Sequence, residues 1–298
     1  MKRPVVIFAN PIAGRGKAMA ISEALQKHLR KTFHVEHFSL PAQTVDLNRV
    51  RALGPLYAAI SIGGDGTLQG VSELLLKITE NNAPPILIVP LGTANLIAKH
   101  LKLPWRRSRD IERIHQALEA RTLVELDACR CNQKIFLAVA GVGFDAQVVH
   151  ELHRRRRGPI TKGSYLFPAV DTFRGYDYPE VSVKVDGKTV FAESPALVYV
   201  GNVREYGTGI PMLPDARSDD DLLDVCVLPC RNRHQALNWM LKAATGMHVK
   251  AEGAVYVRGR KVVIDGPTPV PIQLDGEAAG HTPAKIELMD VRLKFIVE

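Results

Sequence analysis

The chain has 298 residues, of which 46% are hydrophobic and 23% charged, a composition typical of a globular protein long enough for two domains. No apolar run reaches the roughly 18 residues that a membrane-spanning helix needs. The first apolar stretch, Val5–Ala9, is too short for a signal peptide core. A cytoplasmic protein is therefore expected.

The net charge of +8 is unevenly distributed, because residues 1–125 carry 17 Lys and Arg against 10 Asp and Glu. Such an excess indicates an anionic partner: a nucleotide, a nucleic acid or a membrane surface.

The first part of the chain alternates between short apolar strands and helices. The expected strands are Val5–Ala9, His34–Phe38, Tyr57–Ile62 and Ile86–Val89. The expected helices are Arg15–Lys31, a helix starting at Leu68, Asn95–Leu101 and Ser108–Ala120. This alternation predicts a doubly wound α/β domain over residues 1–123 with a parallel sheet. Ligands of such sheets bind at the carboxyl ends of the strands.

From about Thr122 onward the pattern changes to short β-rich runs separated by turn signals such as Asp186-Gly187. The expected strands are Leu123–Cys131, Lys134–Val139, Val181–Val185, Thr189–Ala192, Ala196–Val200, Leu222–Val227, Ala254–Arg258, Lys261–Ile264, Ile286–Leu288 and Val291–Val297. We expect an antiparallel β-sandwich domain over residues 124–298, interrupted by one helix, His234–Thr245.

The four cysteines lack the paired spacing of a zinc site. They are Cys129, Cys131, Cys226 and Cys230. We expect them to pack as small apolar groups.

Three glycine-containing loops follow three of the strands expected in the first domain. They are NPIAGRGK (10–17), GGDGT (63–67) and PLGTAN (90–95). Such turns let backbone N–H groups converge on an anion. Asp65 would repel a phosphate unless a magnesium ion lies between them. Alternatively, the second loop is a tight turn in which Asp65 or Thr67 caps the next helix.

These loops, together with GVGFD (141–145), the acidic run PDARSDDDLLDV (214–225) and LDGE (274–277), resemble in order the motifs of the diacylglycerol kinase catalytic family. That family includes bacterial diacylglycerol kinases, sphingosine and ceramide kinases and relatives of the NAD kinases. The resemblance covers nearly the whole chain. It implies an α/β domain followed by a β-sandwich domain, with the active site in the cleft between them.

The resemblance also implies roles for individual residues, with ATP and Mg²⁺ as cofactors. Glu277 would be the general base that takes the proton of a lipid hydroxyl, and Asp65 would belong to a carboxylate network around catalytic magnesium, with Asp127 as a partner. A second, structural magnesium would be held by the Asp220 side chain and the backbone carbonyls of Arg217 and Leu222. The residues expected to contact ATP are Asn10, Pro11, Gly63, Gly64, Asp65, Gly66, Thr67, Thr93 and Asn95.

Physical chemistry supports these roles, because phosphoryl transfer needs positioning, charge neutralisation and a group that accepts the nucleophile's proton. The alternatives are a surface hairpin turn at Asp275-Gly276-Glu277 and a solvated acidic loop at Asp219–Asp221.

The chain departs from the family pattern at several positions. Leu96 stands where the family often has a third network Asp, and Gln69-Gly70 where it often has Asn-Glu. Asp221 replaces the usual Gly of DDG, and Leu40 lies near a position that usually holds Thr. These departures put the nucleotide contacts and the level of activity in question.

Two basic stretches, Lys99–Arg109 and Arg154–Arg157 with the preceding His153, could bring the protein to a membrane surface. In the first, Trp105 would lie at headgroup level among cations. Either stretch could instead be a solvated charged face, and no motif for nucleic-acid binding accompanies them. Five aromatic or apolar residues could line an acyl channel, although packing in the sandwich core is favoured: Tyr165, Leu166, Phe167, Phe173 and Tyr176.

The combined hypothesis is an ATP- and Mg²⁺-dependent lipid kinase that phosphorylates a lipid hydroxyl, diacylglycerol before ceramide or a sphingoid base. It would associate peripherally with the membrane that carries its substrate. One alternative is a kinase of the NAD kinase type with a soluble substrate. Another is a catalytically weak sensor of nucleotides or lipids. The oligomeric state is left open, a homodimer included.

Overall fold

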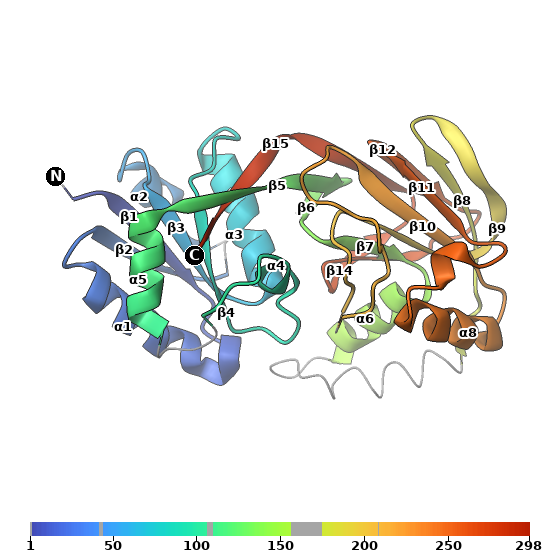
Figure 1. The fold of residues 1–298 in the computed structure, drawn as a ribbon, viewed down its shortest axis with the longest axis horizontal. Coiled ribbons are helices and arrows are strands. Elements are labelled where there is room, and N and C mark those ends of the chain that lie inside the picture. Colours follow the sequence, from blue (N-terminus) through green and yellow to red (C-terminus); the bar gives the residue numbers. More distant parts are fainter. Residues whose placement is uncertain (1, 42–43, 106–109, 156–174, 208) are drawn as a thin grey trace. The chain divides into compact units, whose positions relative to one another are not determined.

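The computed structural model describes residues 2–41, 44–105, 110–155, 175–207 and 209–298 (Figure 1). The chain divides into two compact units, Met1–Leu126 with Val291–Glu298, and Asp127–Asp290. The division expected from the sequence placed all of residues 124–298 in the second domain. The last residues instead belong to the first unit, because the end of strand β15 (Ala284–Val297) pairs in parallel with β4 (Ile86–Pro90).

The first unit is built on a parallel sheet in the order β2-β1-β3-β4-β15. The other bounds are β1 (Pro4–Ala9), β2 (His34–Ser39) and β3 (Ala58–Gly63). All six residues of β3 are buried, as expected for a central strand of a parallel sheet. The α/β class predicted from the alternating pattern is confirmed.

Helices connect the strands of this sheet. They are α1 (Lys17–Leu29), α2 (Leu47–Arg51), α3 (Asp65–Ile78), α4 (Leu96–His100) and α5 (Ile111–Ala120), with a short 3-10 helix η1 (Ala13–Gly16) before α1. Helix α3 begins at Asp65, three residues before the predicted start at Leu68. The GGDGT sequence therefore passes directly from a buried strand into the first turn of a helix.

The second unit contains antiparallel strands arranged in two sheets. One holds β8, β12, β15, β5 and β6, and the other holds β11, β10, β7, β13 and β14. Strand β9 (Lys188–Gly201) belongs to both, because its first half pairs with β8 and its second half, from Ala196, pairs with β7 and β10. A strand that passes between two packed sheets is typical of β-sandwich corners.

The remaining elements of this unit are β5 (Thr122–Cys131), β6 (Lys134–Phe136), β7 (Val139–Val142), α6 (Phe144–Arg155), β8 (Glu180–Val185), β10 (Leu223–Pro229), α8 (Arg233–Ala244), η5 (His248–Lys250), β11 (Val255–Gly259), β12 (Lys261–Asp265), β13 (Pro271–Leu274) and β14 (Glu277–His281). The sandwich class is confirmed. Three details differ from the prediction. The runs expected separately within β9 and within β15 are single strands, and the expected strand Lys134–Val139 is divided into β6 and β7. Helix α6 was not predicted. Strands β13 and β14 were not among the expected strands, although a hairpin turn at Asp275-Gly276-Glu277 was one of the alternatives considered.

The core of the second unit lies between its two sheets and consists mostly of valine, isoleucine and alanine side chains. Cys129 and Cys131 belong to it, and Cys226 and Cys230 are also buried with free thiols. Burial raises the pKa of the Cys131 thiol to about 11. The cysteines therefore pack as small apolar groups, as predicted.

The expected membrane-facing role of Trp105 is wrong. Its side chain is 0% exposed, and its indole Nε1 donates a hydrogen bond of 2.7 Å to the carbonyl oxygen of Ile88 in β4. Leu103 is buried as well. An indole that is buried and hydrogen-bonded to a central strand stabilises the core and cannot reach a bilayer. Residues 106–109 of the same basic stretch lie outside the described residues.

In the described parts of the chain, no helix combines the length and the apolar character required to traverse a bilayer.

We expect Trp105→Phe to lower the free energy of unfolding by about 1 kcal/mol, because it keeps most of the packing and removes the bond to Ile88. Trp105→Ala should cost about 3–5 kcal/mol through the cavity that it leaves. Urea denaturation followed by far-ultraviolet circular dichroism measures both. If neither variant differed from the wild type, Trp105 would not be a core residue.

Candidate functional site

The three glycine-containing loops begin side by side at the carboxyl edge of the parallel sheet. Ala9 of β1 pairs with Ile62 of β3, and Gly63 pairs with Pro90 of β4. The chain leaves β1 toward β2 on one side, whereas β3 lies on the other side of β1. The edge between β1 and β3 is thus a topological switch point, where open α/β sheets bind their ligands.

Glycines let the backbones of these loops touch. A Cβ atom added at Gly92 would lie 2.5 Å from the Cα of Gly64. One added at Gly63 would lie 2.3 Å from Thr67 Oγ1. Both separations are too short for real Cβ contacts. A side chain at Gly92 would force the second and third loops apart, and one at Gly63 would displace the Thr67 side chain within the second loop. A backbone bond of 2.7 Å from Leu91 N to the oxygen of Gly63 joins the second and third loops.

The first loop joins the same group through side chains. Asn10 Nδ2 donates to Thr67 Oγ1 at 3.1 Å, and Asn10 Oδ1 accepts from the backbone nitrogen of Ile12 at 3.2 Å. Gly14 adopts a left-handed conformation (φ 58°), and a Cβ atom added there would lie 3.5 Å from the Leu91 side chain. The structure therefore brings together residues of all three loops that the sequence nominated separately.

The third loop is closed by Asn95, which adopts a left-handed conformation (φ 50°). Its Oδ1 accepts from the nitrogen of Gly92 at 2.8 Å, and its Nδ2 donates to the oxygen of Gly92 at 2.9 Å. The remaining nominated residues, Pro11, Gly66 and Thr93, are each half-buried in their loops. Asn95 thus serves the shape of the loop through its own side chain.

Asp65 is anchored to the backbone of the neighbouring helix. Its Oδ1 accepts a hydrogen bond of 2.7 Å from the nitrogen of Leu96, the first residue of α4. Burial raises the pKa of the Asp65 carboxyl, and the N–H groups of Leu96, Asn95 and Ile97 partly offset that increase. Asp65 does not cap its own helix, because the N-cap of α3 is Gly64, with no side-chain bond. Its carboxylate instead ties the second loop to the third.

The LDGE motif of the second unit forms the two-residue turn of the hairpin β13–β14. Asp275 (φ 51°) and Gly276 (φ 86°) both have positive φ, as a type I′ turn requires. The Asp275 carboxylate accepts three backbone hydrogen bonds, from Leu137, Ala138 and Val139, at 2.7–2.9 Å. These amides follow β6 and lead into β7, which explains why the expected strand is divided there.

Glu277 is the first residue of β14, immediately after that rigid turn. Its side chain is 35% exposed, and its Oε2 lies 3.4 Å from Nδ1 of His153 in helix α6. Helix α6 packs against β13 and β14. The turn, the strand and the helix together fix the position of a carboxylate that solvent can still reach.

The acidic run precedes strand β10 in the second unit. Asp220 Oδ1 accepts from the nitrogen of Leu222 at 3.3 Å, and the nitrogen of Asp221 donates to Asp127 Oδ2 at 3.0 Å. Asp220 and Leu222 are half-buried, whereas Arg217 is exposed with its Nε 3.4 Å from Asp219. The side chain of Asp220 and the backbone carbonyls of Arg217 and Leu222 offer only hard oxygen donors, the kind that Mg²⁺ prefers. A metal at this loop remains a prediction.

Asp145 of GVGFD is a half-buried residue with a buried carboxylate oxygen, and its titration was not foreseen from the sequence. Tyr206 donates to its Oδ2 at 3.0 Å and Gln273 Nε2 at 3.4 Å, whereas Oδ1 is buried with no hydrogen-bond partner in the described residues. Burial raises the pKa of Asp145 to about 6, although Tyr206 opposes this shift. Gln273 also accepts from the nitrogen of Gly276 at 2.8 Å, which links Asp145 to the LDGE turn. The sequence signal that could have identified it is an acid in the first turn of a helix, but helix α6 was not recognised from the sequence.

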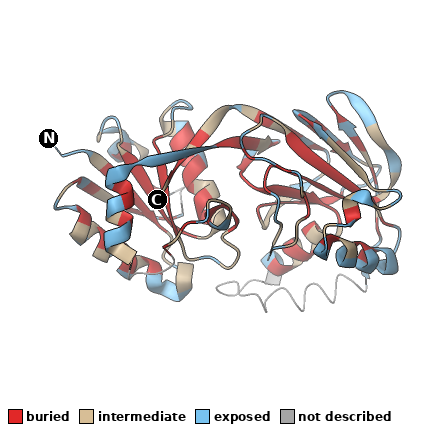
Figure 2. Cartoon of the chain, viewed as in Figure 1, coloured by how far each residue is buried: buried red, intermediate tan, exposed pale blue. Residues whose placement is uncertain are grey.

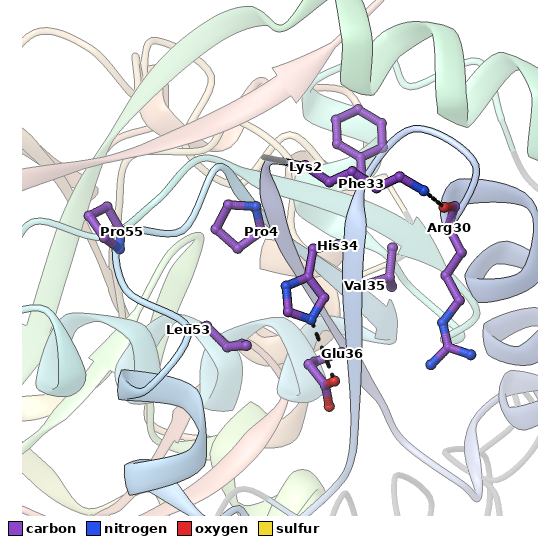
Figure 3. A pocket seen from close by; sticks show the side chains of 9 residues that line it. All are labelled: Lys2, Pro4, Arg30, Phe33, His34, Val35, Glu36, Leu53 and Pro55. Atoms are coloured by element: carbon purple, nitrogen blue, oxygen red, sulfur yellow. Dashed lines mark hydrogen bonds and ion pairs between the residues drawn. The ribbon is translucent and has the colours of Figure 1, made fainter.

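Two other features of the first unit lie away from the glycine loops, toward the amino edge of the sheet. Figure 3 shows a hollow at the starts of β1 and β2, where His34 faces Glu36 at 3.8 Å. Its lining residues are Lys2, Pro4, Arg30, Phe33, His34, Val35, Glu36, Leu53 and Pro55. His28 near the end of α1 bonds to His115 of α5 at 2.9 Å, with Glu112 at 3.3 Å from His28. Neither feature contains a residue nominated from the sequence.

Comparison with known proteins identifies the family. Residues 4–131 match the family described as the diacylglycerol kinase catalytic domain, and residues 138–297 match the YegS C-terminal NAD kinase beta sandwich-like domain. The chain belongs to the diacylglycerol kinase family.

Relatives of this family are similar over nearly the full chain. A diacylglycerol kinase of Staphylococcus carnosus is 26% identical over 95% of this chain and 92% of its own length. One of Bacillus subtilis is 23% identical over 96% and 93%. The crystal structure of a diacylglycerol kinase of Bacillus anthracis has a TM-score of 0.72 and 24% identity, covering 100% of this chain and 97% of that one. Membership of this kinase family makes the protein an enzyme that phosphorylates an alcohol, and the family implies the use of ATP.

We expect Gly92→Ala to lower the free energy of unfolding by about 1–3 kcal/mol, because its Cβ would collide with Gly64. ATP affinity should fall by at least about tenfold as the loops separate. Gly70→Ala is the matched control: nothing lies within 4 Å of its added Cβ, and in helix α3 it should stabilise by about 0.5–1 kcal/mol. Calorimetric titration and urea denaturation measure both effects. Equal behaviour of the two variants would contradict the proposed contact.

The raised pKa of Asp145 predicts a pH-dependent cost. The unfolded chain releases this proton near its ordinary pKa of 3.8, whereas the folded chain holds it up to about pH 6. Asp145 therefore leaves the free energy of unfolding unchanged at low pH and lowers it by up to about 3 kcal/mol above pH 6. The stability of Asp145→Asn relative to the wild type should rise between pH 4 and pH 7. Urea denaturation at several pH values tests this, with Asp177→Asn as the exposed control. Parallel pH profiles for Asp145→Asn and the wild type would refute it.

Proposed function

We propose that the protein transfers the γ-phosphoryl group of ATP to the hydroxyl of a membrane lipid, most directly diacylglycerol, giving phosphatidic acid. The observation that supports this most is the LDGE hairpin. Its turn is held by three amide bonds to Asp275, and the next residue is a carboxylate partly open to solvent. A general base needs a fixed position and access to its substrate, and Glu277 has both.

In the proposed reaction Glu277 takes the proton of the lipid hydroxyl as that oxygen attacks the γ-phosphorus. A new P–O bond forms to the lipid oxygen, the bond to the β–γ bridging oxygen breaks, and ADP leaves. His153, 3.4 Å from Glu277, orients the carboxylate. Positioning and electrostatics supply most of the catalysis of phosphoryl transfer.

The glycine-containing loops are suited to hold the nucleotide phosphates. Their small residues allow close approach to the backbone, and helix α3 starts within the GGDGT loop, so that its N-terminus favours an anion there. Mg²⁺, when bound, would neutralise phosphate charge. Asp65 supplies a carboxylate suited to such an ion, and Asp220 supplies another in the second unit.

The basic stretches proposed as membrane contacts receive different support. The guanidinium of Arg154 in α6 donates two hydrogen bonds of 2.9 Å to the carboxylate of Glu151, from Nε and from Nη2. Part of its positive charge is therefore already balanced within the helix. Arg156 and Arg157 lie outside the described residues, as do Tyr165, Leu166, Phe167 and Phe173. Tyr176 packs edge-on against Phe144 and Tyr178, which favours the core interpretation for that residue.

We expect Glu277→Gln to lower kcat by about 10²–10⁴-fold while ATP binding is retained, because it removes only the proton acceptor. The assay measures ADP release from MgATP with diacylglycerol, ceramide, sphingosine, phosphatidylglycerol or NAD, with lipids in mixed micelles. Glu193→Gln, an exposed glutamate of β9, is the matched control.

Turnover of one lipid that is lost in Glu277→Gln and kept in Glu193→Gln would support the proposal. Turnover of NAD alone would assign the protein to the soluble-substrate kinases. ATP binding without turnover of any acceptor would favour the sensor alternative.

A further inference from the structure

Exposed apolar side chains gather on helix α8 and the segment after it. Among the described residues, eight large apolar side chains are exposed, and four of them lie here: Leu237 (48%), Met240 (49%), Leu241 (64%) and Met247 (60%). In Figure 2 most of α8 is drawn in the colour of exposed residues. Apolar side chains concentrated on one exposed helix mark an interaction surface.

The helix is held in place by a different stripe of side chains. Ala236, Trp239 and Ala243 are buried, and Trp239 Nε1 donates to the oxygen of Pro229 at 2.7 Å. Asn232 caps the N-terminus by accepting from the nitrogens of His234 and Gln235. The exposed Leu237, Met240 and Leu241 are spaced i, i+3, i+4, so they share another face. Packing therefore fixes α8 with an apolar stripe facing outward.

Every Asp, Glu, Lys or Arg in the chain interval that contains this stripe is basic. No Asp or Glu occurs between Asp224 and Glu252, whereas that interval contains Arg231, Arg233, Lys242 and Lys250. Lys242 Nζ lies 5.0 Å from the centre of the Trp239 ring. An apolar helix face on a segment that carries cations and no acids matches the surface of an anionic bilayer.

We propose that α8 docks the protein on an anionic phospholipid bilayer. Leu237, Met240 and Leu241 enter the boundary between headgroups and acyl chains, with Met247 beside them. The exposed basic side chains of Arg231, Arg233 and Lys250 contact lipid phosphates. Its residues belong to neither of the basic stretches nominated from the sequence.

Two other occupants fit less well. In a symmetric contact with a second copy, basic residues of one copy would face basic residues of the other, and this segment supplies no acid to offset the repulsion. Nucleic acid would engage the cations and polar side chains, but the exposed stripe of Leu237, Met240 and Leu241 offers no hydrogen bond to a base or a phosphate, and the Trp239 ring is buried and unavailable for stacking. Docking would also bring the enzyme to its lipid substrate; this second statement rests on the proposed lipid kinase function.

The test measures binding of the full chain to vesicles by sedimentation, without nucleotide. Vesicles of phosphatidylcholine with phosphatidylglycerol are compared with phosphatidylcholine alone. Leu237→Asp with Leu241→Asp should lower the affinity for the anionic vesicles at least about tenfold. Gln235→Glu with Asn238→Asp adds the same charge to exposed polar positions of the same helix and should change it less than about threefold. Circular dichroism checks that both variants fold.

Equal binding by the two double variants, or no preference of the wild type for anionic vesicles, would overturn the proposal. So would a dimer in light scattering that only the Leu237/Leu241 variant loses. Phosphorylation of a short-chain diacylglycerol dispersed in detergent is measured in parallel. Lost vesicle binding with retained turnover supports docking as a step separate from the chemistry. Vesicle binding by a wild type that phosphorylates no lipid would refute the proposed function and leave the docking intact.

Discussion

The candidate phosphate site depends on the contact between the backbones of Gly64 and Gly92. Strands β3 and β4 are neighbours, so their loops start together, yet only residues without a Cβ can let those loops touch. This contact places Asp65 where it reaches the first amide of α4 at 2.7 Å. The start of α3, the start of α4 and the turn between them thus form one connected edge. A loop with larger residues would separate the two helix N-termini whose partial positive charge favours phosphate.

Carboxylates in this protein repeatedly hold backbone amides rather than cations. Asp65 accepts from Leu96, Asp275 from three amides before β7, and Asp186 from the amides of Arg260 and Lys261. Such bonds supply partners for amides at loops and chain crossings, where no ladder is available. Glu277 differs, because the partner that the structure shows for it is the imidazole of His153. In the LDGE motif, one acid therefore builds the turn, and the next, Glu277, stays partly exposed, as the proposed general base requires.

Local patterns predicted much of this architecture from the sequence. The alternation of apolar runs and helices indicated the parallel sheet, and the glycine loops were placed correctly at its carboxyl edge. The failures involve contacts between distant residues. Trp105 looked amphipathic among cations, but its partner is Ile88 in the core. The chain returns to the first unit through β15, whose pairing with β4 joins Phe295 to Ile86. Neither of these two contacts between distant residues produces a pattern in the neighbouring sequence.

The candidate site of the second unit was also predictable only where local sequence patterns reveal it. Asp-Gly at 275–276 is a recognisable hairpin turn, and the resemblance to known motifs identified Glu277. The amides that fix this turn come from residues 137–139, far away in sequence, so no spacing reveals them. Asp145 was recognised as part of a motif, but its raised pKa arises from burial beside Tyr206 and Gln273. Titration depends on surroundings that only the fold assembles.

The departures from the family pattern leave the scaffold of the first site intact. Leu96 lacks a carboxylate, yet the group that anchors Asp65 is its backbone nitrogen, which any residue other than proline supplies. The Leu96 side chain is buried, so its position contributes to packing. Gly70 stands where a Cβ would meet nothing within 4 Å, so its change does not disturb the loops. In the proposed reaction, the missing carboxylates would lower the negative charge available to a metal ion beside the phosphates and would leave the shape of the loops unchanged.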